Sequence, residues 1–174
     1  KFHDIPNTVS KTALVACEHE IFMFNVHALG GFEMMKSARQ VLEERSQIGK
    51  RRPLMLGVTI LTSHAPSDLP EQLGIQRTIE EEVLHLARLA HKAGLDGVVS
   101  SPQEIEFLRK EFGDDFLIVT PGIRPKGTDK GDQKRIFTPK EAFDAGATFI
   151  VVGRPITAAS DPKKAVEKIF NSLA

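Results

Sequence analysis

Apolar runs of strand length recur along the chain, and the segments between them carry helical patterns. The runs do not alternate between apolar and polar residues, which is typical of strands buried on both faces of a parallel sheet. We predict such strands at residues 20–27, 54–61, 95–100, 116–120 and 148–153. Residues 1–4 are interpreted as the tip of one more strand.

Helices are predicted between the strands, from apolar spacing and from residues that cap helix starts. Apolar side chains recur three or four residues apart from Met34 to Leu42 and from Ile79 to Ala90, which predicts an amphipathic helix in each place. Pro162 is expected to open a final helix. Three pairs match the capping box, in which each side chain binds a free N–H at the helix start: Thr78 with Glu81, Ser101 with Glu104, and Thr138 with Glu141.

Strands that alternate with helices imply an α/β fold, either a barrel or an open doubly wound sheet. No G-x-G-x-x-G follows a strand, which disfavours the dinucleotide-binding version of the open sheet. Polar residues gather where the strands end, as they do at the C-terminal mouth of a (β/α)8 barrel. We therefore expect one domain over residues 1–174, a (β/α)8 TIM barrel without its first two strands and most of its third. The start at Lys1, without an initiator methionine, leads us to expect a cut chain.

The charge balance, the lengths of the apolar runs and the cysteine count argue against several classes of function. Lysine plus arginine equals aspartate plus glutamate, 23 each, so the net charge is zero, which argues against a nucleic-acid or membrane surface. No apolar run approaches the roughly 18 residues of a membrane span, and no signal peptide is visible. The single cysteine, Cys17, lies in an apolar stretch, so we expect a buried structural thiol in a reducing cytoplasm.

Lys1 and Asp4 are the first candidates for chemistry, because a lysine and an aspartate at a barrel mouth can form a charged cluster. Residues 1 and 3 of a strand share a face, while residue 4 points the other way. On residue type and spacing alone, a solvated strand end is the stronger interpretation. Thr62 and Ser63 also end a predicted strand, but most such residues merely terminate it. His27 is interpreted as a satisfied strand-end histidine.

Anion binding is predicted after the later strands. Gly153 and Arg154 follow the last buried strand, where barrels usually hold a phosphate, and arginine grips phosphate with two parallel hydrogen bonds. The alternative is a surface arginine. Residues 121–135 form a long polar, glycine-rich segment, a candidate lid, in which Arg124 and Gln133 are best suited to hold an anion. The histidines show no metal-ligand spacing, so no metal site is expected.

Together these motifs resemble the orotidine 5′-phosphate decarboxylase family in its bacterial form, whose signature is D-x-K-x-x-D-I-P-N-T. The chain supplies all but the first two residues, as K-F-H-D-I-P-N-T. V-T-I-L-T-S, V-T-P-G-I-R-P, D-Q-K-R and I-V-V-G-R-P-I-T match in order and approximate spacing. The resemblance covers essentially the whole chain. The family's aspartate two residues before the catalytic lysine would precede Lys1, so the chain is expected to be incomplete for catalysis.

The resemblance implies decarboxylation of orotidine 5′-phosphate to UMP, the last step of de novo pyrimidine synthesis, without a cofactor or metal. It implies a cytoplasmic homodimer with shared active sites. Lys1 would protonate C6 as carbon dioxide leaves, and Asp4 would reach into the partner's site. Thr8 would touch the neighbouring subunit's ligand, and Thr62 would contact the base. The remaining substrate and phosphate contacts would be Arg124, Gln133, Gly153 and Arg154.

Two other functions remain open from the sequence. One is a magnesium-dependent lyase or synthase acting on a sugar phosphate, which belongs to the same barrel superfamily and carries a similar D-x-K-x-x-D. The run I-P-N-T after Asp4 disfavours it. The other is an inactive barrel fragment that serves as a binding or structural unit.

Overall fold

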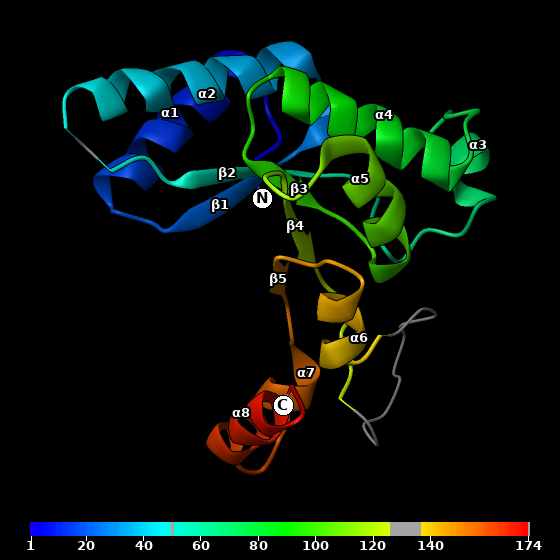
Figure 1. The fold of residues 1–174 in the computed structure, drawn as a ribbon. Helices are drawn as coiled ribbons and strands as arrows, with labels where there is room; N and C mark the ends of the chain where they lie inside the picture. The colour runs from blue at the N-terminus through cyan, green and yellow to red at the C-terminus, as the bar shows by residue number, and fades with distance from the viewer. Residues whose placement is uncertain (50, 126–136, 174) are drawn as a thin grey trace.

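Five parallel strands form one sheet in a computed structural model of the chain, which describes residues 1–49, 51–125 and 137–173. Each strand pairs with the next one along the chain (Figure 1). This order is that of consecutive barrel strands, whereas a doubly wound sheet reverses its order part-way. The strands are β1 (Met23–His27), β2 (Leu54–Val58), β3 (Gly97–Val99), β4 (Leu117–Thr120) and β5 (Phe149–Ile150).

The predicted strand tip at residues 1–4 is confirmed beside β1. Phe2 forms a parallel bridge with Val26, so the sheet continues beyond β1 by one more segment. The Phe2 N–H donates to the Asn25 carbonyl at 3.1 Å, and the His27 N–H donates to the Phe2 carbonyl at 2.9 Å. The observed sheet is therefore part of a barrel, as predicted.

The strands are shorter than the apolar runs that predicted them. The run at 20–27 begins as strand only at Met23, because Glu20 adopts a left-handed φ of 53° at the turn that ends the preceding helix. The run at 148–153 keeps two residues of strand, although the Val151 N–H still donates to the Thr120 carbonyl at 2.8 Å. The apolar residues just outside these two ladders are exposed: Ile21 is 42%, Phe22 53% and Val151 49% exposed.

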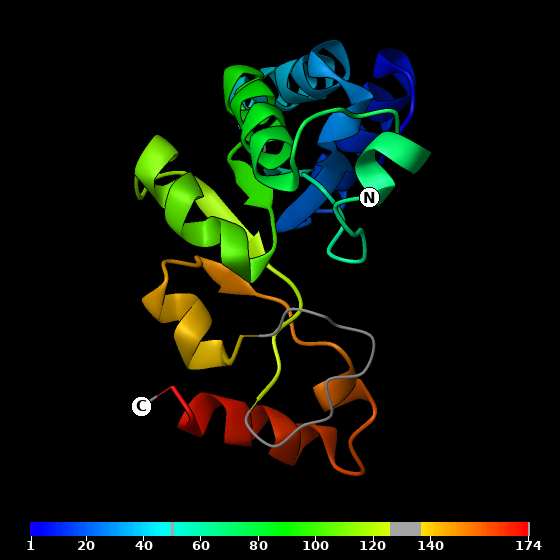
Figure 2. The same ribbon diagram turned by 90° about the vertical axis from the view of Figure 1, so that its right-hand side faces the viewer.

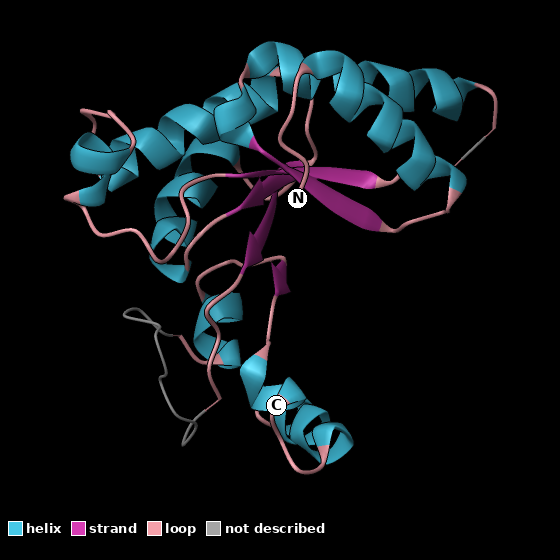
Figure 3. Ribbon diagram, turned by 180° about the vertical axis from the view of Figure 1, so that it is seen from behind, coloured by secondary structure: helices cyan, strands magenta, loops and turns pink. Residues whose placement is uncertain are grey.

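The helices lie between the strands along the chain, as predicted. Figure 3 shows α1, α2 and α4 on the same side of the sheet. Helix α1 was not predicted. The longer helices are α1 (Pro6–Glu18), α2 (Phe32–Gln47), α4 (Ile79–Lys92), α5 (Ile105–Phe112), α6 (Pro139–Asp144) and α8 (Pro162–Asn171). The short ones are α3 (Asp68–Gln72), α7 (Arg154–Thr157) and the 3-10 turns η1 (Ala28–Gly30) and η2 (Pro102–Glu104).

The predicted caps are observed at the helix starts. In both α4 and α6 the capping threonine accepts the N–H of the glutamate three residues later, and that glutamate accepts the threonine N–H. At η2 the Glu104 carboxylate accepts the Ser101 N–H at 2.8 Å. Pro162 opens α8, and the Asp161 carboxylate caps it by accepting the Lys164 N–H at 3.0 Å.

The two faces of the sheet have different neighbours. A Cβ atom on Gly57 would lie 3.1 Å from the Ala90 Cβ of α4, so Gly57 faces the helices. The residues paired with Gly57 across the sheet form one level and share this direction. Val26, Val98 and Ile118 lie at the same level and are fully buried there. Because side chains alternate along a strand, the next level faces the inside of the barrel: His27, Val58, Val99 and Val119.

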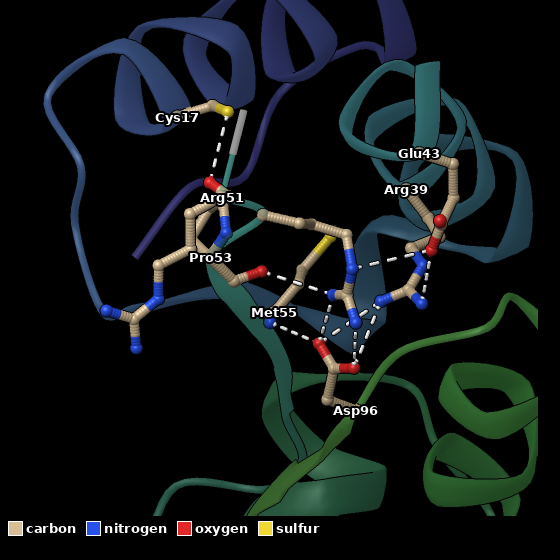
Figure 4. A network of polar contacts seen from close by, with 8 residues as sticks. Cys17, Arg39, Glu43, Arg51, Pro53, Met55 and Asp96 are labelled. Carbon is tan, nitrogen blue, oxygen red and sulfur yellow. Dashed lines mark hydrogen bonds and ion pairs between the residues drawn. The ribbon is translucent and has the colours of Figure 1, made fainter. Parts of the chain in front are cut away.

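An arginine–carboxylate network closes the opposite, N-terminal end of the strands (Figure 4). Asp96, just before β3, accepts hydrogen bonds from Arg52 and from Arg39 of α2, and also from the Met55 N–H at 2.7 Å. Burial alone would raise the pKa of Asp96, but the bonds from Arg52 and Met55, with the charge of Arg39, hold this pKa below its usual value. This end of a barrel usually serves stability, which fits the network.

No described helix combines the length and the apolar character needed to cross a membrane. Cys17 is buried, as predicted, and its thiol lies 3.6 Å from the Arg51 carbonyl (Figure 4).

Candidate active site

A pocket of about 270 Å³ lies at the C-terminal ends of β2, β3 and β4. It brings together Lys1 and Thr62, two of the residues predicted to act on the substrate. The rest of its wall is mostly apolar, which lowers the local dielectric and strengthens electrostatic effects on a bound molecule. The full lining is Lys1, Val58, Ile60, Leu61, Thr62, Ser63, Val99, Ser100 and Pro121.

The strand tip at residues 1–4 places Lys1 at this pocket. Its middle residue, Phe2, packs against the core on the helix side of the sheet, with its ring 5.6 Å from the Phe24 ring. Because side chains alternate, Lys1 and His3 lie on the opposite face, which is the inside of the barrel. The position of Lys1 therefore follows from the pairing of Phe2 with β1.

His3 stacks on His27 on that inner face, with ring centroids 5.5 Å apart and planes 32° apart. Burial lowers the pKa of His27 from its ordinary value of 6.5, and the neighbouring charges of His3 and Lys1 lower it further. The His27 backbone N–H is satisfied by Phe2, as the strand-end interpretation expected. The imidazole, however, belongs to the surroundings of Lys1, which that interpretation missed.

Asp4 and Thr8 are exposed and do not line the pocket. The Asp4 carboxylate accepts the Ile5 N–H at 2.7 Å, one residue before α1 begins. Thr8 lies in the first turn of α1, where its carbonyl accepts the Thr12 hydroxyl at 2.9 Å.

The predicted anion-binding residues are not in the Lys1 pocket. Gly153 and Arg154 are exposed at the start of α7. Figure 2 shows this orange segment below the sheet. Arg124 is 6% exposed and donates from its guanidinium to the Ile123 carbonyl at 2.9 Å. Gln133 and the larger part of the predicted lid, residues 126–135, lie outside the described residues.

The pocket contains polar residues that the sequence did not single out. Ser63 was considered only as a strand terminator, and Ser100 only as the last residue of a predicted strand. The Ser100 hydroxyl is buried and has no hydrogen-bond partner among the described residues. The available signal was their position at two predicted strand ends: Ser63 comes two residues after the run at 54–61, and Ser100 ends the run at 95–100. No three described His, Cys, Asp or Glu side chains are grouped to hold a metal ion, and the expectation of no metal stays a prediction.

Comparison with known proteins finds relatives along the whole chain. A protein named orotidine 5′-phosphate decarboxylase from Pseudoalteromonas translucida is 51% identical over 173 residues, which are 99% of this chain and 72% of that protein. One of the same name from Vibrio parahaemolyticus is 51% identical, over 100% of this chain and 73% of that protein.

Solved structures show the same fold. The crystal structure of orotidine 5′-phosphate decarboxylase from Lactobacillus acidophilus matches with a TM-score of 0.85 and 44% identity, covering 99% of this chain and 72% of that one. The enzyme from Pyrococcus horikoshii, 23% identical with a TM-score of 0.71, shares the fold. The family model described as orotidine 5′-phosphate decarboxylase / HUMPS matches residues 1–169, and the chain therefore belongs to this family.

Proposed function

We propose that this chain carries the active site of an orotidine 5′-phosphate decarboxylase, which converts orotidine 5′-phosphate to UMP in de novo pyrimidine synthesis. The observation that carries the proposal is the pocket that joins Lys1 to Thr62 at the barrel mouth. It is supported by relatives of that name at about 50% identity along the whole chain.

Lys1 is proposed as the catalytic group. Loss of carbon dioxide leaves a localised carbanion at C6 of the pyrimidine ring. An ammonium fixed beside C6 stabilises that charge more in the transition state than in the substrate, and then donates the proton. The apolar wall formed by Val58, Ile60 and Val99 excludes water and so strengthens this effect.

The rest of the substrate is proposed to bind along the barrel mouth. Thr62, in the same pocket as Lys1, would contact the base. Arg154 and the Gly153 N–H would bind the phosphate, with Gln133 and Arg124 assisting. Binding energy from the phosphate, remote from C6, would then favour closure of the segment at 121–135 over the substrate.

The active unit is proposed to be a cytoplasmic homodimer with shared sites and no cofactor. Asp4 and Thr8 are exposed and lie outside the pocket of their own chain, which suits residues that serve a neighbouring subunit. We further propose that residues 1–174 belong to one domain.

The magnesium-dependent sugar-phosphate enzyme is the less favoured candidate, because the relatives at about 50% identity carry the decarboxylase name. An inactive fragment is the other alternative.

The test uses two proteins: the 174-residue chain, and this chain fused to the part of the Pseudoalteromonas relative that it does not match. The absorbance change of orotidine 5′-phosphate is followed in excess EDTA. We expect turnover by the fused protein. If that protein folds and shows no turnover, or turns over only after magnesium is restored, the proposal is wrong.

A further inference from the structure

Two pairs of aromatic rings hold the strand tip that carries Lys1 and Asp4, one pair on each face of the sheet. On the helix side, the Phe2 and Phe24 rings lie 5.6 Å apart. On the inner face, the His3 and His27 rings lie 5.5 Å apart. The first pair cannot change its charge, whereas the second consists of two groups that can each take up a proton.

The backbone attachment between these pairs is slight. The described hydrogen bonds between the tip and β1 are two, from the Phe2 N–H to the Asn25 carbonyl and from the His27 N–H to the Phe2 carbonyl. His27 is thus both the residue whose N–H holds the tip and the residue whose ring contacts it. A change in the charge of its ring acts directly on this attachment.

We propose that His3 and His27 form a proton-sensitive clamp on the tip, closed when both imidazoles are neutral and loosened when His27 takes up a proton. His27 is then a positioning residue, which acts through the placement of Lys1. The activity part of this proposal rests on the proposed function, whereas the structural part does not.

Like-charge repulsion is the physical cause. The described side chains whose charge acts on His27 both come from the tip: His3 and Lys1. Its register neighbour on β2, Val58, is uncharged and offers no compensating carboxylate. A proton on His27 therefore places a second positive charge near the Lys1 ammonium, on the ring that contacts the tip.

The pKa of His27 in the folded chain lies below 6.5, because burial and the charges of His3 and Lys1 disfavour the protonated ring. This lowered pKa sets the pH range in which the clamp weakens. With this lowered pKa, His27 in the closed clamp binds fewer protons at a given pH than His27 in the open clamp. The clamp is therefore at full strength above about pH 6.5 and weakens as the pH falls from there through the folded pKa.

Nuclear magnetic resonance of the histidine rings in the 174-residue chain tests the contact. We expect the midpoint of His27 to lie below 6.5 and to rise in His3→Asn, because this variant removes a titratable ring 5.5 Å away that lowers the pKa of His27. The control is His19→Asn, an exposed histidine at the end of α1, which should leave the midpoint unchanged. If the titration midpoint of His27 is the same in His3→Asn as in the wild type, the proposal is wrong.

Amide hydrogen exchange tests the loosening. Corrected for the intrinsic rate, protection of the His27 N–H should fall about threefold or more between pH 7.5 and pH 5.5. Protection of the Ser100 N–H, which donates to the Val119 carbonyl elsewhere in the sheet, should not change. In His27→Phe, which keeps a ring without a titrating group, protection at position 27 should be independent of pH. Equal losses in the wild type and in His27→Phe would show that the imidazole is not the cause.

Turnover adds a third readout. Below pH 6.5, the kcat of the fused protein described above should fall as His27 takes up a proton, with the midpoint that nuclear magnetic resonance gives for His27. The His27→Phe variant should lose this pH dependence of kcat. The KM should change little. A protein inactive at every pH would contradict the proposed function, and the two spectroscopic tests would still decide the clamp.

Discussion

The Asp96 carboxylate accepts two hydrogen bonds from the Arg52 guanidinium, at 2.7 and 2.8 Å, across the N-terminal ends of β2 and β3. The partners lie 44 residues apart in the sequence, and their side chains are only 20% and 14% exposed. Arg39 reaches the same carboxylate from α2 at 3.1 Å. One carboxylate thus joins the starts of two strands to a helix.

Asp96→Asn should lower the free energy of unfolding by about 3 kcal/mol at pH 7, since removing one member of a mostly buried charge cluster leaves the others uncompensated. Urea unfolding followed by circular dichroism measures the change. Asp115→Asn, at an exposed position of the same end, is the control and should change stability by less than about 0.5 kcal/mol.

The Asp96 carboxylate should also make the free energy of unfolding depend on pH. Because its folded pKa lies below the ordinary 3.8, its contribution is complete above that value and is lost as the pH falls through the folded pKa. The difference in unfolding free energy between wild type and Asp96→Asn should therefore shrink below about pH 4. A difference that stays constant from pH 7 to pH 3 would contradict this explanation.

Lys1→Ala should lower kcat of the fused protein by about a hundredfold to a thousandfold or more, the cost of removing one group aimed at developing charge. KM should change far less, because the ammonium acts mainly in the transition state. Lys11→Ala, at an exposed position of α1, is the matched control and should keep full activity. A similar loss in both variants would indicate a general effect of charge.

Shared sites predict that two inactive subunits can complement each other. Lys1→Ala and Asp4→Ala should each be inactive alone. A mixture should recover part of the activity, because one site of the mixed dimer keeps both groups. If subunits exchange, as shown by mass spectrometry of the mixture, and no activity returns, both residues act within one subunit.

Arg154→Ala should lower kcat/KM for orotidine 5′-phosphate by at least about tenfold, the size of one charge-assisted hydrogen bond to phosphate. For orotidine, which lacks the phosphate, the same change should matter little. Added phosphite should raise the wild-type rate on orotidine and help the variant much less. Equal losses on both substrates would assign Arg154 a structural role instead.

Local signals in the sequence predicted the order of the strands and the starts of α4, α6 and α8. The capping residues Thr78 and Thr138 act through neighbours three residues away, so their effect is visible without the fold. Strand ends were less predictable. The run at 148–153 is apolar throughout, yet its ladder ends at Ile150, because pairing depends on the neighbouring strand.

The tertiary structure alone decided which residues meet. Lys1 and Thr62 lie 61 positions apart in numbering and share a pocket because two strands end at the same mouth. The sequence alone gave no sign that His27 contacts another histidine. The pairing of Phe2 with Val26 places the His27 ring against His3. Likewise no local pattern joins Asp96 to Arg52, since strand register brings them together. Residue types and short spacings are encoded along the chain, whereas contacts between strands exist only once the sheet has formed.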